Sequence, residues 1–145
     1  MLNVDAYNNA IQDIQTYLLL NMLPLLLWST VLIAIAFIGL FKKFVKKYIA
    51  FFLVGFGILV LSYSLIEILT FNHDIQKANF DVYYGEFDYM QVSGNEKDVF
   101  EFPRESNLSV RSVADLKIQS GTHHGYILYC KTSRWVIAYS SVPFE

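Results

Sequence analysis

The chain has 145 residues, 54% hydrophobic and 17% charged, and its mean hydropathy of +0.37 is typical of a small membrane protein rather than a soluble enzyme. The formal net charge is −2, and residues 72–145 carry ten acidic against seven basic residues. A mildly acidic surface does not hold phosphate backbones, so we expect no nucleic-acid partner. Cys130 is the single cysteine, so an internal disulfide is excluded and we expect a buried, apolar thiol.

Residues 1–16 are predicted to form an amphipathic lead-in on the extracytoplasmic side. The apolar residues that recur at three- and four-residue spacing are Ala10, Ile11, Ile14, Tyr17 and Leu18, and Asp5 is placed to cap the start of a helix. Such a segment either lies in the outer membrane interface or continues directly into the next helix. No basic residue precedes the apolar run that follows, and this run is longer than a signal-peptide core of about 7–15 residues, so cleavage is not expected.

Residues 17–71 are predicted to form a transmembrane helical hairpin. Residues 17–40 are 24 positions without a charge, and residues 48–66 are 19 more, after which the apolar run continues past Glu67 to Phe71. A 24-residue helix rises about 36 Å, enough to cross a hydrocarbon core of about 30 Å. Backbone polar groups in lipid must be satisfied within the segment, so each run should be helical and contact the bilayer. Pro24 should bend the first helix modestly.

The loop at residues 41–47 indicates the orientation of this hairpin. It contains four lysines, whereas residues 1–16 contain no basic residue. Short lysine-rich loops remain on the cytoplasmic side of a membrane. We therefore expect a two-pass protein of the cell membrane with both termini extracytoplasmic.

Small residues recur at seven-residue spacing in both apolar runs, and this spacing keeps them on one seam of a left-handed helix pair. The predicted helix–helix contact residues are Ser29 and Ala36 in the first run and Ala50, Gly57 and Ser64 in the second. Chance is the alternative explanation, because small residues are common in membrane helices.

Asn21 and Glu67 are the polar residues that interrupt these runs most conspicuously, and we predict that they also belong to the helix–helix contact. They lie equally far from Phe44 along the sequence, one before it and one after it, so a symmetric hairpin brings both to similar depth near the outer surface. An intramembrane carboxyl seeks a partner or an aqueous path. In the structural interpretation, Glu67 forms a hydrogen bond with Asn21 or with water. In the functional alternative, Glu67 forms an ion or proton site, or a contact with another membrane protein.

Residues 72–145 are predicted to form an extracytoplasmic β domain, a small antiparallel barrel or curled sheet. The apolar alternation predicts a strand over residues 80–92, with a bulge at Gly85 where the phase of the alternation changes. Further strands are predicted over 99–102, 107–113, 116–119, 126–131 and 135–140, with a turn at 93–95, a loop at 121–125 and a hairpin turn at 132–134. The whole chain is therefore predicted to be an α+β membrane protein.

Twelve aromatic residues in this domain are more than the alternation of a sheet with one buried face explains. Trp135 and Leu128 are expected in the core. The excess suggests a closed barrel covered elsewhere, contact with the membrane, or a partner surface, for which tyrosine and tryptophan are favoured. The candidate partner residues are Tyr83, Tyr89, Tyr129, Trp135 and Tyr139.

The sequence carries no pattern typical of catalysis, a metal site or a cofactor site. His123 and His124 are adjacent, so an extended backbone directs them to opposite faces, and no CxxC or HExxH spacing exists. We therefore expect neither an enzyme nor a cofactor, and a function in protein binding.

The leading hypothesis is a bacterial membrane immunity protein that binds an envelope-acting toxin or bacteriocin. Small size, outward display, aromatic residues and an acidic balance that would meet a basic toxin favour it. The alternative is an accessory or regulatory subunit of a larger membrane complex, such as a transporter, secretion system or sensor, docked through Glu67 and the small-residue seam.

Overall fold

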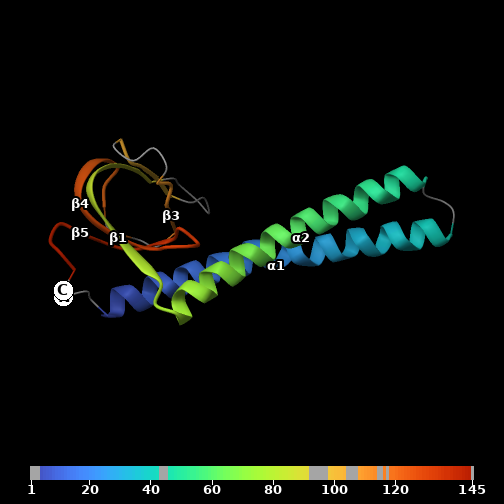
Figure 1. Ribbon diagram of the computed structural model, residues 1–145, viewed down its shortest axis with the longest axis horizontal. Coiled ribbons are helices and arrows are strands. Elements are labelled where there is room, and N and C mark those ends of the chain that lie inside the picture. The colour runs from blue at the N-terminus through green and yellow to red at the C-terminus, as the bar shows by residue number, and fades with distance from the viewer. Residues whose placement is uncertain are drawn as a thin grey trace. The chain divides into compact units, whose positions relative to one another are not determined.

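The computed structural model describes residues 4–42, 46–91, 98–103, 108–113, 116 and 118–144. Two long helices, α1 (Val4–Phe41) and α2 (Lys47–Gln76), are followed by the strands β1 (Phe80–Met90), β2 (Asp98–Glu101), β3 (Arg111–Ser112), β4 (Gly121–Cys130) and β5 (Val136–Ser140) (Figure 1). The chain is thus α+β, as its sequence predicts. It divides into two compact units: Met1–Tyr17 with Thr70–Glu145, and Leu18–Leu69. The lead-in therefore groups with the β domain.

The lead-in continues directly into the first apolar run, which was one of its two predicted arrangements. Helix α1 includes both segments and is continuous through Pro24. The amphipathic pattern is also present: Ala10, Ile14 and Leu18 are buried and Ile11 and Tyr17 are half-buried, whereas the polar residues between them, such as Gln12, are exposed. Helix α2 runs past the predicted end of the hairpin at Phe71 and ends at Gln76.

Both helices are long and apolar enough to cross a membrane, judged by length and composition. In each, 17% of the most apolar 18-residue window is buried inside the structure. Large apolar side chains instead point outward; for example, Trp28 is 67% exposed and Phe52 is 71% exposed. This distribution is the opposite of that in the core helix of a water-soluble protein, which buries its apolar side chains.

Within the described residues the strands form one sheet in the order β3-β2-β1-β4-β5, and each neighbouring pair is antiparallel. Three sequential strands followed by a fourth that returns beside the first is the Greek-key arrangement. The sheet curls until its two ends meet: Arg111 and Trp135 form a parallel bridge, and Arg111 N donates to Arg134 O at 3.0 Å. The result is a small, nearly closed five-stranded barrel (Figure 1).

Strand β1 does not contain the predicted bulge at Gly85. Its pairing with β4 is unbroken from Phe80 opposite Cys130 to Tyr89 opposite Gly121. The buried positions of β1 begin at Tyr83 and fall on the odd-numbered residues, so Val82 and Tyr84 lie on the outer face instead of in the core. The register shift of the sheet lies between β4 and β5, at Leu128 and Tyr129.

Gly85 and Gly125 pair directly across β1 and β4, and each makes room for a tyrosine ring. A Cβ atom at Gly85 would lie 2.6 Å from the Tyr83 hydroxyl, and one at Gly125 would lie 2.8 Å from Cε2 of Tyr139. The phase change in the sequence therefore marks a close approach of aromatic rings to the backbone, which only glycine permits.

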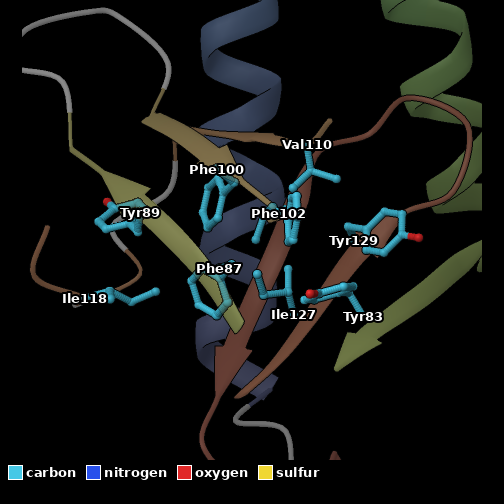
Figure 2. Close-up of a cluster of buried hydrophobic side chains, with 10 residues drawn as sticks. Tyr83, Phe87, Tyr89, Phe100, Phe102, Val110, Ile118, Ile127 and Tyr129 are labelled. Atoms are coloured by element: carbon cyan, nitrogen blue, oxygen red, sulfur yellow. The ribbon is translucent and has the colours of Figure 1, made fainter. Parts of the chain in front are cut away.

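The barrel core is an aromatic cluster contributed mainly by β1, β2 and β4 (Figure 2). Its buried members are Tyr83, Phe87, Tyr89, Phe100, Phe102, Val110, Ile118, Ile127, Tyr129 and Val136. Trp135 is also fully buried, as predicted, but Leu128 is only half-buried, because it shares the outer face with Val82.

Burial of these side chains corrects the predicted partner surface. Tyr83, Tyr89 and Tyr129 are buried in the core cluster, and Trp135 is buried in contact with Tyr17 and Arg111, so none of the four is accessible to a partner. Tyr139 is partly buried and packs against the same core cluster. The physical reason is size: a barrel this small needs large rings to fill its interior.

The remaining strand predictions differ in detail. Residues 121–125, predicted as a loop, are the first half of β4, and the described part of 116–119 is not a strand. β3 is only Arg111–Ser112 within the predicted strand at 107–113. The predicted turn at 93–95 lies outside the described residues.

Candidate functional site

The Leu18–Leu69 unit contains the predicted small-residue seam. Ser29 and Ala36 of α1 and Ala50, Gly57 and Ser64 of α2 are all buried. A Cβ atom at Gly57 would lie 2.7 Å from Cγ1 of Ile33 and 3.2 Å from the carbonyl oxygen of Ser29. The backbone of α2 thus approaches α1 closely at Gly57, as small-residue packing allows.

The seam hydroxyls are satisfied within their own helices. Ser29 Oγ donates to the carbonyl of Leu26 at 2.9 Å, and Ser64 Oγ donates to the carbonyl of Val60 at 3.0 Å. Bonds to the preceding turn leave these residues effectively small and apolar toward the neighbouring helix. Asn21 and Glu67 are both half-buried, and neither is without an interaction partner. Their mutual hydrogen bond stays a prediction.

A second notable site lies where α2 ends and the barrel begins. Asn79 N donates to the carbonyl of Asp74 at 2.8 Å, and Ala78 N donates to the carbonyl of Ile75 at 3.2 Å. Ala78 has a φ of 48°, so this helix ends in a Schellman motif with alanine where glycine is usual.

Asp74 lies in this last turn and is completely buried. Its Oδ2 accepts hydrogen bonds from Thr132 N at 3.0 Å, Ser133 N at 2.7 Å and Ser133 Oγ at 3.0 Å. Its Oδ1 accepts a hydrogen bond from Asn79 Nδ2 at 2.7 Å. One carboxylate thus binds the end of α2 to the β4–β5 turn.

The electrostatics of this junction follow from burial and hydrogen bonding. Burial by itself raises the pKa of the Asp74 carboxyl, but the hydrogen bonds from Ser133, Thr132 and Asn79 outweigh it, and the net pKa is lowered. Burial, together with the nearby Asp74 charge, raises the pKa of the Cys130 thiol to about 12. Cys130 is therefore a protonated, buried thiol, as its sequence context suggests.

The first part of α1 covers the side of the barrel next to this junction. Tyr7 contacts the ring of Phe80 edge-on at 5.9 Å, and Tyr17 contacts the ring of Trp135 at 5.6 Å. The Arg111 guanidinium lies 4.4 Å from the centre of the Trp135 ring. The lead-in is therefore a structural cover for Phe80 and Trp135 on this side of the barrel.

The outer barrel surface carries an aromatic strip, which we define as Val82, Tyr84, Tyr126 and Leu128; the first two are exposed and the last two are half-buried. Val82 pairs with Leu128 and Tyr84 with Tyr126 across β1 and β4, so all four share one face. The rings of Tyr84 and Tyr126 are stacked with centroids 4.4 Å apart. Val82 is 46% exposed and Tyr84 is 58% exposed.

Acidic residues continue the same face beyond the strip. Glu86 and Asp88 follow Tyr84 on the outer positions of β1, and Asp88 pairs directly with Glu101 of β2. We name Glu86, Asp88 and Glu101 the acidic end of the strip. On the outer positions of β1, β2 and β4 that the structure describes, the basic side chain is His124, which lies opposite Glu86.

The two adjacent histidines are separated by the barrel wall, as extended backbone requires. The His123 ring contacts Phe87 and Tyr139 on the inner side, whereas the His124 ring contacts Tyr84 on the outer side at 4.9 Å. Among the described residues, no group of three or more His, Cys, Asp or Glu side chains is arranged to hold a metal ion.

Sequence reasoning missed both Asp74 and the aromatic strip. For Asp74 a signal existed: Ala50, Gly57, Ser64 and Phe71 recur every seven residues and are all buried, and the position three residues after Phe71 faces the same side of the helix. The strip could not be found in the same way, because nothing in the sequence indicates which of the two apolar faces of β1 points inward.

Comparison of the chain with family models, curated proteins and solved structures finds no match.

Proposed function

We propose that this chain is an integral membrane protein that crosses the bilayer twice and presents its barrel outside the cytoplasm to bind a protein partner. The observation that carries the membrane assignment is the outward exposure of large apolar side chains along two helices of sufficient length. In water this surface would drive aggregation, whereas lipid tails satisfy it.

The proposed orientation has residues 41–47 in the cytoplasm and both termini outside, because the loop is rich in lysine. Cysteine accessibility in intact cells tests it, with Phe41→Cys as the inner position and Val142→Cys as the outer one; both residues are exposed. Cys130 should add little background, because it is buried and its pKa is raised to about 12. A membrane-impermeant maleimide should label position 142 and not position 41, and the reverse pattern would refute the orientation.

Within this class we propose an immunity protein against an envelope-acting toxin or bacteriocin. The supporting feature is the exposed ring of Tyr84, stacked on the half-buried ring of Tyr126, since exposed aromatic residues are typical anchors of protein–protein contacts. An acidic surface next to those rings favours encounter with a basic toxin.

Survival of a sensitive cell tests this proposal. Expression of the chain should protect against one specific toxin, and Tyr84→Ala should abolish protection while membrane insertion and protein level remain unchanged. Phe52→Ala is the matched control, because it removes an aromatic residue of α2 that is also exposed, at 71% against 58% for Tyr84. Absence of protection against every envelope-acting toxin tried, or equal loss with both variants, would contradict the proposal.

A second candidate is an accessory subunit of a larger membrane complex, which is favoured by the half-buried carboxyl of Glu67 within an apolar helix. This candidate implies co-purification with other membrane proteins in mild detergent. Complex formation should then be lost in Glu67→Gln and retained in Tyr84→Ala, the opposite of the immunity outcome.

A further inference from the structure

The aromatic strip and its acidic end form one continuous outer face of β1 and β4. Tyr84 and Tyr126 stack at 4.4 Å, and Glu86 is two residues further along β1 on the same side. Phe144, in the tail after β5, approaches the Tyr126 ring at 6.5 Å. The exposed surface is thus apolar and aromatic at one end and negatively charged at the other.

Among the described residues, the charge arrangement on this face is unfavourable for the barrel by itself. Asp88 and Glu101 are directly opposite each other across β1 and β2, and like charges at such positions destabilise a sheet. Thr122 Oγ1 donates to Asp88, which satisfies one oxygen without neutralising the charge. Arg111 cannot compensate, because its guanidinium lies over Trp135.

Building on the binding role proposed above, we propose that this face docks an extended, positively charged segment of a protein partner. Charge complementarity identifies the occupant: arginine or lysine side chains would pair with Glu86, Asp88 and Glu101. The exposed face of Tyr84 accepts a guanidinium by cation–π stacking, which is unavailable to an acidic or purely apolar segment.

Binding of a short peptide to the full-length protein tests the chemistry of the face independently of any toxin. The protein is placed in nanodiscs of zwitterionic phosphatidylcholine, and the probe is fluorescent Gly-Arg-Tyr-Arg-Tyr-Arg-Gly, followed by anisotropy. The control peptide replaces each arginine by glutamate, and empty nanodiscs supply the blank.

Two variants and a charge-matched control locate the binding. Glu86→Gln with Glu101→Gln should weaken binding of the arginine peptide roughly fivefold, because two exposed ion pairs are lost. Tyr84→Ala should weaken it about tenfold, as for an aromatic anchor. Asp5→Asn with Asp13→Asn removes the same charge from α1 and should leave binding unchanged.

The outcomes separate this inference from the proposed function. Equal binding of both peptides, equal binding by all variants, or no binding above the blank overturns the docking of a basic segment, even where the cell is protected from a toxin. Selective loss with Glu86→Gln and Glu101→Gln supports it, even where no protection is observed and the immunity proposal fails.

Discussion

Replacing Asp74 by alanine is expected to loosen the barrel from the end of α2. The substitution removes the acceptor of three hydrogen bonds from the β4–β5 turn and of one from Asn79. The amide of Ser133 is then left buried without its acceptor. The Schellman motif remains, because its bonds use the backbone of residue 74.

The size of the effect follows from these contacts. Hydrogen bonds to a charged group are worth about 1.5–3 kcal/mol each, they are not additive, and an orphaned buried donor costs about 1–3 kcal/mol. We therefore expect Asp74→Ala to lower the free energy of unfolding by about 3–5 kcal/mol. Asp74→Asn should cost only about 1–2 kcal/mol. The remaining side-chain oxygen still accepts hydrogen bonds from the turn, and the Asn79 amide can rotate so that its oxygen accepts a hydrogen bond from the new amide nitrogen at position 74.

The difference between the wild type and Asp74→Asn should depend on pH. The pKa of Asp74 is lowered by folding, so its contribution to stability is present above the unfolded pKa of about 3.9 and is lost as the pH falls through the folded pKa. The stability gap between the two proteins should thus be constant above about pH 5 and should shrink at lower pH.

Guanidinium titration of the full chain in detergent measures these values, with Trp135 as the fluorescent reporter. A Trp28→Phe background removes the other tryptophan, which is 67% exposed on α1. Stability of Asp74→Ala equal to that of the wild type, or a gap to Asp74→Asn that does not change with pH, would refute the assignment of Asp74 as the residue that binds helix to turn.

Three further substitutions have definite expectations from the geometry. Ala78→Gly should raise the free energy of unfolding by about 0.5–1 kcal/mol, because glycine adopts the left-handed conformation of this residue without strain; an unchanged denaturation midpoint would contradict the strain. Gly125→Ala should cost about 1–3 kcal/mol in thermal unfolding, since its Cβ would lie 2.7 Å from the Ser140 carbonyl, whereas Gly55→Ala, with open space around it, should cost nothing. Glu67→Gln should change stability by no more than about 0.6 kcal/mol and leave function intact; loss of function in a folded, inserted protein would favour the accessory-subunit or ion-path alternative.

The helices could be derived from the sequence because the required information is local. The uncharged run at residues 17–40 is apolar whatever surrounds it, and the heptad of small residues that we predicted to face the partner helix is indeed buried at Gly57 and Ser64. The existence of a curled antiparallel sheet also followed from short alternating segments separated by turns.

The face of each strand could not be derived in this way. Residues 82–84 of β1 are all apolar, so a period of two fits either register equally well. Pairing with β4, which is distant in the sequence, decides that Tyr83 fills the interior and Tyr84 points outward. The residues predicted to contact a partner were therefore mostly core residues. The aromatic strip consists instead of residues next to them in β1 and β4.

Composition and local periodicity thus determined that this chain has two long apolar helices and a small β domain, because both depend on residues close together in sequence. The tertiary structure alone decided the role of Asp74, whose carboxylate binds a turn 58 and 59 residues further along the chain. It also decided which tyrosines a partner can reach, because burial in a closed barrel depends on contacts between strands that are distant in sequence.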